Sequence, residues 1–247
     1  MKEHPLFPWD HQSDQPYIIR NRKLKRKIYL RASWQMFKSA LLFPLLPIFV
    51  LVLLVRKSWA KKNVDQCIGL SVHVETECEG KTIVPLKELK QMVEDLGVKQ
   101  LLVRVPLSDR ENFDTYIDHI DALSSAQREV TVQLIQSRLL LDDPTALKET
   151  LRDIIGRLKG KTEYIHVGNA YNRRKWAFQH FGEYFKFFQR IRSISREVAP
   201  EMKLIGGSVI DFELPPFLES LFHFRRGRYD GYGIQLYVDR RGAPENT

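Results

Sequence analysis

Two hydrophobic patterns divide the chain. A run without any charged residue, ALLFPLLPIFVLVLLV, covers residues 40–55. Beyond residue 63, short runs rich in β-branched residues alternate with segments in which apolar residues recur at helical spacing. The first pattern is typical of a segment that leaves water, and the second is typical of strands alternating with amphipathic helices.

The alternating part predicts repeated strand-helix units. Strands are expected at 67–74, 100–105, 130–136, 164–168, 203–210 and 232–238, and helices at 86–96, 112–123, 144–158, 182–198 and 216–224. The strand starts lie about 30 to 40 residues apart, which is the length of one such unit. Gly97 suits the position just after a helix, and Asp143 before Pro144 suits an N-cap.

Several expected strands are apolar at nearly every position, as in LLVRV at 101–105. Such strands are buried on both faces, and strands joined by helices normally run parallel. An open doubly wound sheet and a (β/α)8 barrel both satisfy this pattern. No glycine-rich phosphate-binding motif follows a strand, which removes the usual nucleotide-binding form of the open sheet.

The positive charge of the chain lies almost entirely before these units. The formal net charge is +9, yet residues 1–62 hold thirteen Lys and Arg against three acidic residues, so the remainder is close to neutral. The basic run RNRKLKRK at 20–27 shortly precedes the apolar run. Because the folded domain itself is not basic, a membrane surface is a simpler partner than nucleic acid.

The apolar run predicts a single transmembrane helix. We expect a basic cytoplasmic arm at 1–38, the anchor at 39–55 with Pro44 and Pro47 kinking its first half, and a linker at 56–65. Basic residues are denser before the anchor than after it, so the positive-inside rule predicts a cytoplasmic N-terminus and an external domain. A buried core helix would have to bring both charged flanks to solvent, and a cleaved signal peptide would need a far shorter n-region.

Cysteine and histidine usage predicts no metal site and no cofactor. Cys67 and Cys78 are the only cysteines, and no Cys/His cluster has metal-ligand spacing. A strand lying between the two cysteines would hold them farther apart than a disulfide permits. We therefore expect two thiols.

The stretch YIHVGNAYNRRKW at 164–176 is the most informative motif of the chain. It resembles the end of the fourth strand in retaining glycoside hydrolases of clan A, above all the family 39 branch that includes bacterial exopolysaccharide endoglycosidases. In that family an apolar strand is followed by Gly-Asn-Glu-Pro-Asn and then by Arg and Trp. Ala170 stands here in place of the Glu, and the matching residues are Gly168, Asn169, Asn172, Arg173 and Trp176.

The resemblance covers about residues 66–247 and implies a TIM-type (β/α)8 barrel that is incomplete, with about six strands and a truncated C-terminal side. Weaker matches to the family fall on the first, second and sixth strands, and Gly69 is one of those on the first strand. The substrate-binding residues that the resemblance implies are His73, Arg104, Asn169, Asn172, Arg173, Trp176, Gln235 and Tyr237.

In the family, a glutamate at the position of Ala170 is the acid/base, and a second carboxylate ending strand seven is the nucleophile. A methyl group cannot transfer a proton, and acid/base assistance is worth about 10² to 10⁴ in rate. Glu75 and Glu213 are the first candidates for a substitute acid. Other carboxylates expected near strand ends are Glu77, Asp109, Asp211, Asp239 and Glu245.

Several of these residues also have structural interpretations. His73 and His166 suit hydrogen-bonded core histidines, and Arg104 suits a structural ion pair. The aromatic residues of 184–188 have helical spacing and suit core packing. Trp176 and Tyr237 are better candidates for stacking on a sugar face, because we expect them at the mouth of the barrel.

We therefore predict a membrane-anchored, glycoside hydrolase-like protein of the bacterial inner membrane, with its barrel in the periplasm. It would bind or process a cell-envelope polysaccharide, with hydrolysis impaired or lost, as in a pseudoenzyme. An active hydrolase of O-glycosyl bonds that uses another carboxylate is the first alternative. A non-catalytic scaffold for envelope polysaccharide-assembly proteins is the second.

Overall fold

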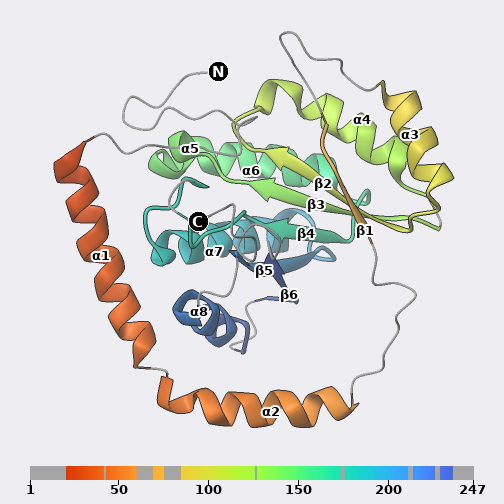
Figure 1. Cartoon of the computed structure of the whole chain (residues 1–247). Helices are drawn as coiled ribbons and strands as arrows, with labels where there is room; N and C mark the ends of the chain where they lie inside the picture. Colours follow the sequence, from red (N-terminus) through yellow and green to blue (C-terminus); the bar gives the residue numbers. More distant parts are fainter. Residues whose placement is uncertain are drawn as a thin grey trace, which may run out of the picture.

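The computed structural model describes residues 21–41, 43–59, 69–74, 85–125, 127–173, 176–210, 214–225 and 229–235. Six strands in this part of the chain form one sheet, in which every neighbouring pair is parallel and the order follows the sequence (Figure 1). The strands are β1 (Gly69–Val72), β2 (Gln100–Pro106), β3 (Glu129–Ile135), β4 (Tyr164–Val167), β5 (Lys203–Ile210) and β6 (Gly231–Gln235). A doubly wound sheet reverses its strand order and this sheet does not, so the fold is a TIM-like α/β barrel that is open between β1 and β6.

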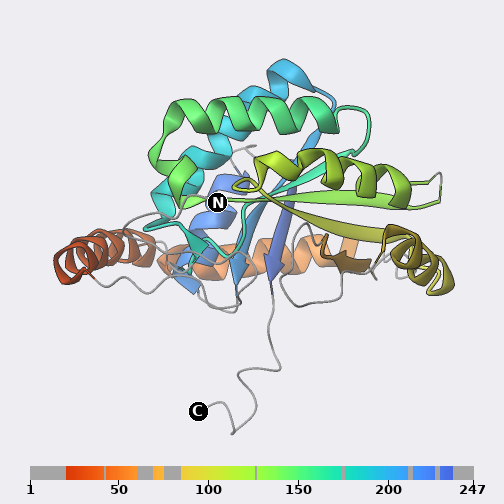
Figure 2. The ribbon, with the colours of Figure 1, turned by 90° about the horizontal axis from the view of Figure 1, so that it is seen from above.

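Helices cover the convex face of the sheet (Figure 2). They are α3 (Leu86–Asp95), α4 (Phe113–Leu123) after the short η3 (Arg110–Asn112), α5 (Arg138–Asp142), α6 (Pro144–Leu158), α7 (Phe181–Val198) and α8 (Leu214–Arg225). Alternate strand residues such as Leu101, Val103 and Val105 point under these helices and are almost fully buried. Their neighbours Leu102 and Arg104 point to the concave face and are only half-buried.

The predicted elements agree closely with the observed ones. Strand 203–210 and helix 144–158 have the predicted ends, and the Asp143 carboxylate accepts hydrogen bonds from the Thr145 and Ala146 amides at 3.0 Å, which confirms the N-cap. Gly97 has the positive φ of 61° that a residue after a helix requires. The short α5 was not predicted, because five residues are too few to show a helical period.

The N-terminal part differs from the prediction. Residues of the basic arm form α1 (Arg22–Ala40), and the apolar run is divided into η1 (Phe43–Leu45) and α2 (Leu46–Trp59). Proline supplies no amide hydrogen, so Pro44 and Pro47 explain why the helix is interrupted at this point rather than only kinked. Within the described residues, the structure contains no helix that is both long and apolar enough to cross a membrane.

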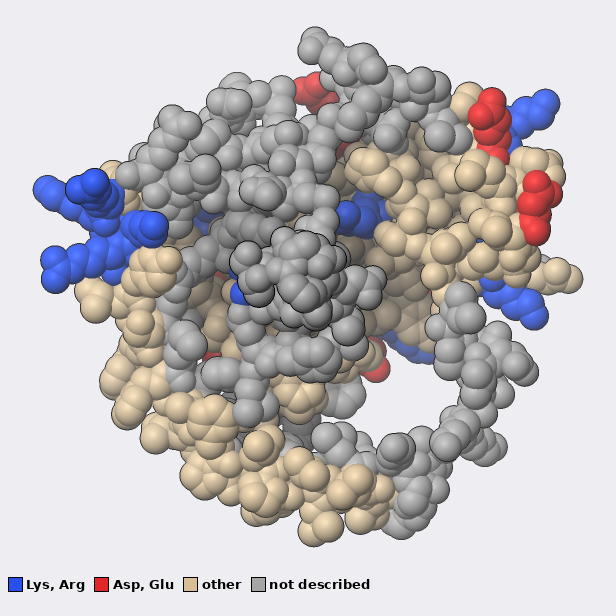
Figure 3. Space-filling view, viewed as in Figure 1, with Lys and Arg blue, Asp and Glu red and all other residues tan. Residues whose placement is uncertain are grey.

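The helix α1 packs against the barrel on one side. α1 packs against α8, and Ile28 is only 2% exposed. The Lys and Arg side chains of α1 gather on one flank of the molecule (Figure 3). Cys67 and Cys78 lie outside the described residues, so the expectation of two thiols stays a prediction.

Close packing at Gly206 provides a test of the fold. A Cβ at this buried β5 residue would overlap the ring of Tyr229, so Gly206→Ala should destabilise the protein by about 1 to 3 kcal/mol through overpacking. Gly156→Ala is the matched control, since a Cβ on this exposed helical residue would meet nothing closer than Val198 Cγ1 at 3.9 Å. It should stabilise the protein by about 0.5 to 1 kcal/mol. Urea unfolding measures both, and equal effects would contradict the packing at Gly206.

Candidate functional site

Asn169 lies at the centre of the carboxyl rim, by which we mean the carboxyl ends of the strands and the segments that follow them. It comes directly after β4 and Gly168 and is 4% exposed. Its Oδ1 accepts a hydrogen bond of 2.7 Å from Nε2 of Gln235 at the end of β6. The structure therefore brings together two residues that the sequence assigned to one site from strands four and six.

The backbone of Asn169 is fixed by Gln136, a buried residue at the end of β3. Gln136 Oε1 accepts from the Asn169 amide at 2.9 Å, and its Nε2 donates to the Asn169 carbonyl at 2.8 Å and also to the Trp176 carbonyl. Gln133 Nε2, on the same strand, donates to the Gly168 carbonyl at 2.9 Å. Sequence reasoning missed both glutamines. The signal that could have identified them is a polar residue at the end of an otherwise apolar strand, next to the motif.

Ala170 and Asn172 do not line an open cleft, as catalytic residues would. Ala170 is fully buried and has a positive φ of 42°. The side chain of Asn172 is directed at the backbone of β5, since its Oδ1 accepts from the Ile210 amide at 2.8 Å and its Nδ2 donates to the Ile210 carbonyl at 2.9 Å. Asn172 therefore ties the segment after β4 to the end of β5.

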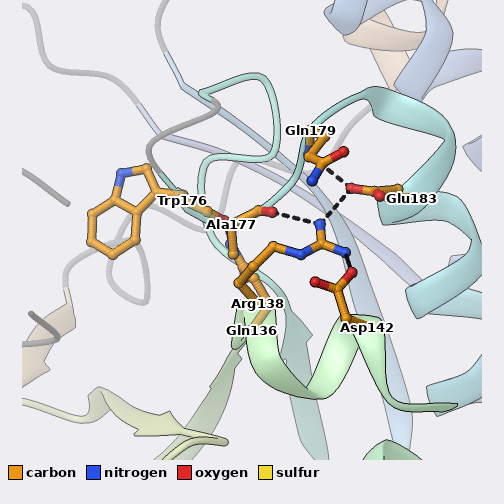
Figure 4. A network of polar contacts seen from close by, with 7 residues as sticks. All are labelled: Gln136, Arg138, Asp142, Trp176, Ala177, Gln179 and Glu183. Carbon is orange, nitrogen blue, oxygen red and sulfur yellow. Dashed lines mark hydrogen bonds and ion pairs between the residues drawn. The ribbon is translucent and has the colours of Figure 1, made fainter. Parts of the chain in front are cut away.

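Trp176 and Arg104 meet at the rim. Both are half-buried, and the Arg104 guanidinium carbon lies 5.7 Å from the centre of the Trp176 ring, within the range of a cation–π contact. In Figure 4 the indole points away from the polar network that lies behind it. Two residues that the sequence assigned separately to the substrate site, from strand two and from the segment after strand four, therefore contact each other.

That network is built around Arg138, which is 3% exposed. Its Nη1 donates to the Ala177 carbonyl at 3.0 Å and to the Glu183 carboxylate at 2.9 Å, and its Nη2 pairs with Asp142. Although burial opposes the charge, the Asp142 and Glu183 carboxylates raise the pKa of Arg138. Glu183 also accepts from the Gln179 amide at 2.8 Å, so the network holds the segment after Trp176 at two backbone positions.

His166 on β4 is half-buried and hydrogen-bonded, in line with its structural interpretation. Burial lowers its pKa to about 4, so the ring is neutral at pH 7. Its Nε2 lies 2.8 Å from Ser208 Oγ, which is also 3.0 Å and 3.2 Å from the carbonyls of Val167 and Gly168. Since the single hydroxyl hydrogen is needed for a carbonyl, Nε2 is assigned the imidazole hydrogen.

The other predicted site residues do not join this cluster. His73 lies just beyond the edge strand β1 and lines a separate cavity of about 230 Å³, together with side chains of α3 and α4. Arg173 is half-buried, and its amide donates to the Ala170 carbonyl at 2.8 Å. Asp109 accepts hydrogen bonds from Tyr116 and Asn112. Residues that lie outside the described part of the chain are Glu75, Glu77, Asp211, Glu213, Tyr237, Asp239 and Glu245.

No metal centre is visible in the part of the chain that the structure describes. It contains no group of three or more His, Cys, Asp or Glu side chains that could hold a metal ion. The site that the structure assembles is therefore made of amide, guanidinium and indole groups.

The lowered pKa of His166 predicts a loss of stability in acid. An unfolded histidine binds a proton near pH 6.5, while folded His166 does so only near pH 4. Stability from this residue is therefore complete above pH 6.5 and is lost as the pH falls toward 4, by at most about 3 kcal/mol. His166→Gln should remove this part of the pH dependence, measured as the free energy of unfolding from pH 7 to 4. Parallel pH profiles for the two proteins would contradict it.

Comparisons with known proteins give weak likenesses. No family model matches the chain, and neither does any curated protein. Solved structures that resemble it include Thermotoga maritima Cel5A in complex with mannotriose (15% identity, TM-score 0.41), a glycoside hydrolase family 6 enzyme from Coprinopsis cinerea (14%, 0.40), and the virulence factor SghA with the substrate analogue salicin (12%, 0.38).

These alignments cover 58%, 64% and 50% of this chain, and 53%, 58% and 35% of the respective solved chains. The chain thus spans between one third and three fifths of the structures that it resembles. The fold assignment rests on the strand order and direction described above. The family 39 resemblance, and the interpretation of Ala170 as a replaced glutamate, stay predictions.

Proposed function

We propose that the carboxyl rim around Asn169 and Trp176 binds an oligosaccharide of the cell envelope and does not cleave it. The observation that carries the proposal is that one buried amide, Gln136, bonds to the backbones of both residues. The backbones of Asn169 and Trp176 are therefore held beside each other. Such a site needs little ordering when a ligand arrives.

The side chains at this rim match the chemistry of a sugar. A pyranose has an apolar C–H face and a periphery of hydroxyl groups. The indole of Trp176 offers a flat apolar surface, while Gln235 Oε1 is a buried acceptor without a hydrogen-bond donor among the described residues. A pocket with an aromatic wall and a few placed polar groups is the usual form of a small-ligand site.

Binding is favoured over hydrolysis because three carboxylates of the described rim are engaged. Retaining hydrolysis needs two carboxyl groups about 5 to 5.5 Å apart. Asp142 and Glu183 pair with Arg138, Asp109 accepts two hydrogen bonds, and Ala170 has no carboxyl group. An active hydrolase that uses Glu75 or Glu213 remains the alternative, as does a scaffold for polysaccharide assembly.

Attachment to a membrane through the N-terminal helices is part of the same proposal. It is supported by the basic and apolar residues of α1 and α2. A single-pass arrangement, with the N-terminus in the bacterial cytoplasm and the barrel in the periplasm, stays a prediction.

Trp176→Ala tests the binding site. Removing the indole should weaken oligosaccharide binding by about tenfold or more, because a central aromatic contact is lost. Isothermal titration with a panel of neutral and acidic envelope oligosaccharides measures the change. Trp34→Ala on α1 is the matched control and should leave the affinity unchanged. A panel without any ligand, or equal losses in both variants, would refute the proposal.

Ala170→Glu tests the loss of hydrolysis. The site has closed around a methyl group at a strained backbone position, so this variant should be less stable than the wild type and should release no reducing ends from any glycan. Ala170→Gly is the control, since glycine adopts a positive φ freely and should stabilise the fold by about 1 kcal/mol. Measurable cleavage by Ala170→Glu would favour the hydrolase alternative.

A further inference from the structure

The helix α2 exposes many apolar side chains between residues 48 and 55. Ile48, Val50, Leu51, Val52, Leu54 and Val55 are between 40% and 63% exposed. Consecutive helical residues point about 100° apart, so the three residues at 50–52 alone cover most of the circumference. A helix that is apolar all round is normally enclosed by a protein core or a membrane.

The helix α1 indicates which of these encloses α2. It has no acidic residue, and its basic side chains are exposed at Arg22, Lys23, Lys25, Arg26, Lys27 and Arg31. On the same helix Leu30, Trp34 and Phe37 are more than half exposed. Basic residues combined with exposed aromatic and aliphatic residues suit the headgroup region of an anionic bilayer, and charge complementarity therefore selects lipid over an apolar protein surface.

α1 is also fastened to the barrel. It packs against α8, and its Ile28 is buried. Arg31 lies close enough to His180 to lower the pKa of that histidine beyond the effect of its burial, and His180 immediately precedes α7 on the carboxyl rim. A bilayer crossed by α2 would separate α1 from α8, so this contact requires α1 and the barrel to lie on one side.

The two helices define a plane. In Figure 1, which looks onto the carboxyl ends of β5 and β6, both helices run across the view along the border of the barrel. In Figure 2 they lie at the height where β5 and β6 end, with the body of the barrel on the opposite side. A flat surface that touches both helices without entering the barrel therefore faces the carboxyl ends of β5 and β6.

We propose that α1 and α2 lie together on an anionic membrane surface, with the N-terminus and the barrel on the same side and the carboxyl ends of β5 and β6 facing the bilayer. This arrangement rests on the membrane attachment in the proposed function and does not depend on sugar binding. It presents this part of the rim to molecules at the membrane surface rather than to the open solution.

Vesicle binding tests the contact surface. The full chain is mixed with phosphatidylcholine vesicles with and without phosphatidylglycerol, and the bound fraction is measured by flotation. Binding should require the anionic lipid. Lys23→Gln/Lys27→Gln should lower the partition constant about thirtyfold, at roughly fivefold for each charge near the surface.

The matched control is Lys99→Gln/Lys159→Gln, which removes the same charge from two exposed residues at the amino ends of β2 and beyond the end of α6. This pair should bind as the wild type does. If both double variants lowered the partition constant equally, or if the folded chain did not bind anionic vesicles, the proposal would be overturned and a protein partner for α2 would be favoured.

Cysteine labelling tests the topology. Asn21→Cys and Lys148→Cys are made separately in a Cys67→Ser/Cys78→Ser background whose fold is checked by circular dichroism. Both new cysteines lie at exposed positions, one before α1 and one on α6. A membrane-impermeant maleimide on spheroplasts should label both or neither, and permeabilisation should expose both. Labelling of only one would overturn the proposal and support the single-pass arrangement.

Discussion

The position of the candidate site depends on the Gln136 side chain. Its amide exchanges two hydrogen bonds with the backbone of Asn169, as a neighbouring strand would, at the point where β3 and β4 have already ended. If this amide were removed, two buried backbone groups would lose their partners at about 1 to 3 kcal/mol each. Asn169 and Trp176 are therefore positioned by a residue that lies outside their own motif.

The open barrel explains where apolar side chains remain exposed in the folded domain. Leu70 on β1 and Met92 and Leu96 on and after α3 are 37%, 54% and 64% exposed, and Ile234 on β6 is 44% exposed. In a closed eight-stranded barrel these convex-face positions would be covered by adjoining strand-helix units. The same opening leaves Arg104 on the concave face of β2 half-buried, although its registered partner Gln133 is buried. Burial therefore falls from the middle of the sheet toward its edges.

Much of the fold could be predicted from the sequence because it is set by local patterns. Periodicity gave the strands and most helices, and Asp143 and Gly97 marked helix ends through their own backbone chemistry. The partners of the site residues could not be predicted in this way. The contacts Asn169–Gln235 and Arg104–Trp176 join residues 66 and 72 positions apart. The four residues were assigned to one site only because a family pattern placed them there, and the contacts themselves were not predicted. Gln136 and Arg138 belong to no such pattern and were missed.

Ala170 shows that a sequence motif can match a catalytic site although the folded surroundings do not. The sequence suggests one lost group in an otherwise intact cleft, which a single substitution would restore. In the structure the residue is enclosed and has a left-handed backbone conformation, and the next residue, Tyr171, stacks on Tyr184 with the ring centres 4.3 Å apart. A long acidic side chain would need both a cavity and a different local path of the backbone, since cores packed to this density tolerate little added volume. The surroundings therefore fit a methyl group, and a proton donor at position 170 would require changes in the packing around it as well.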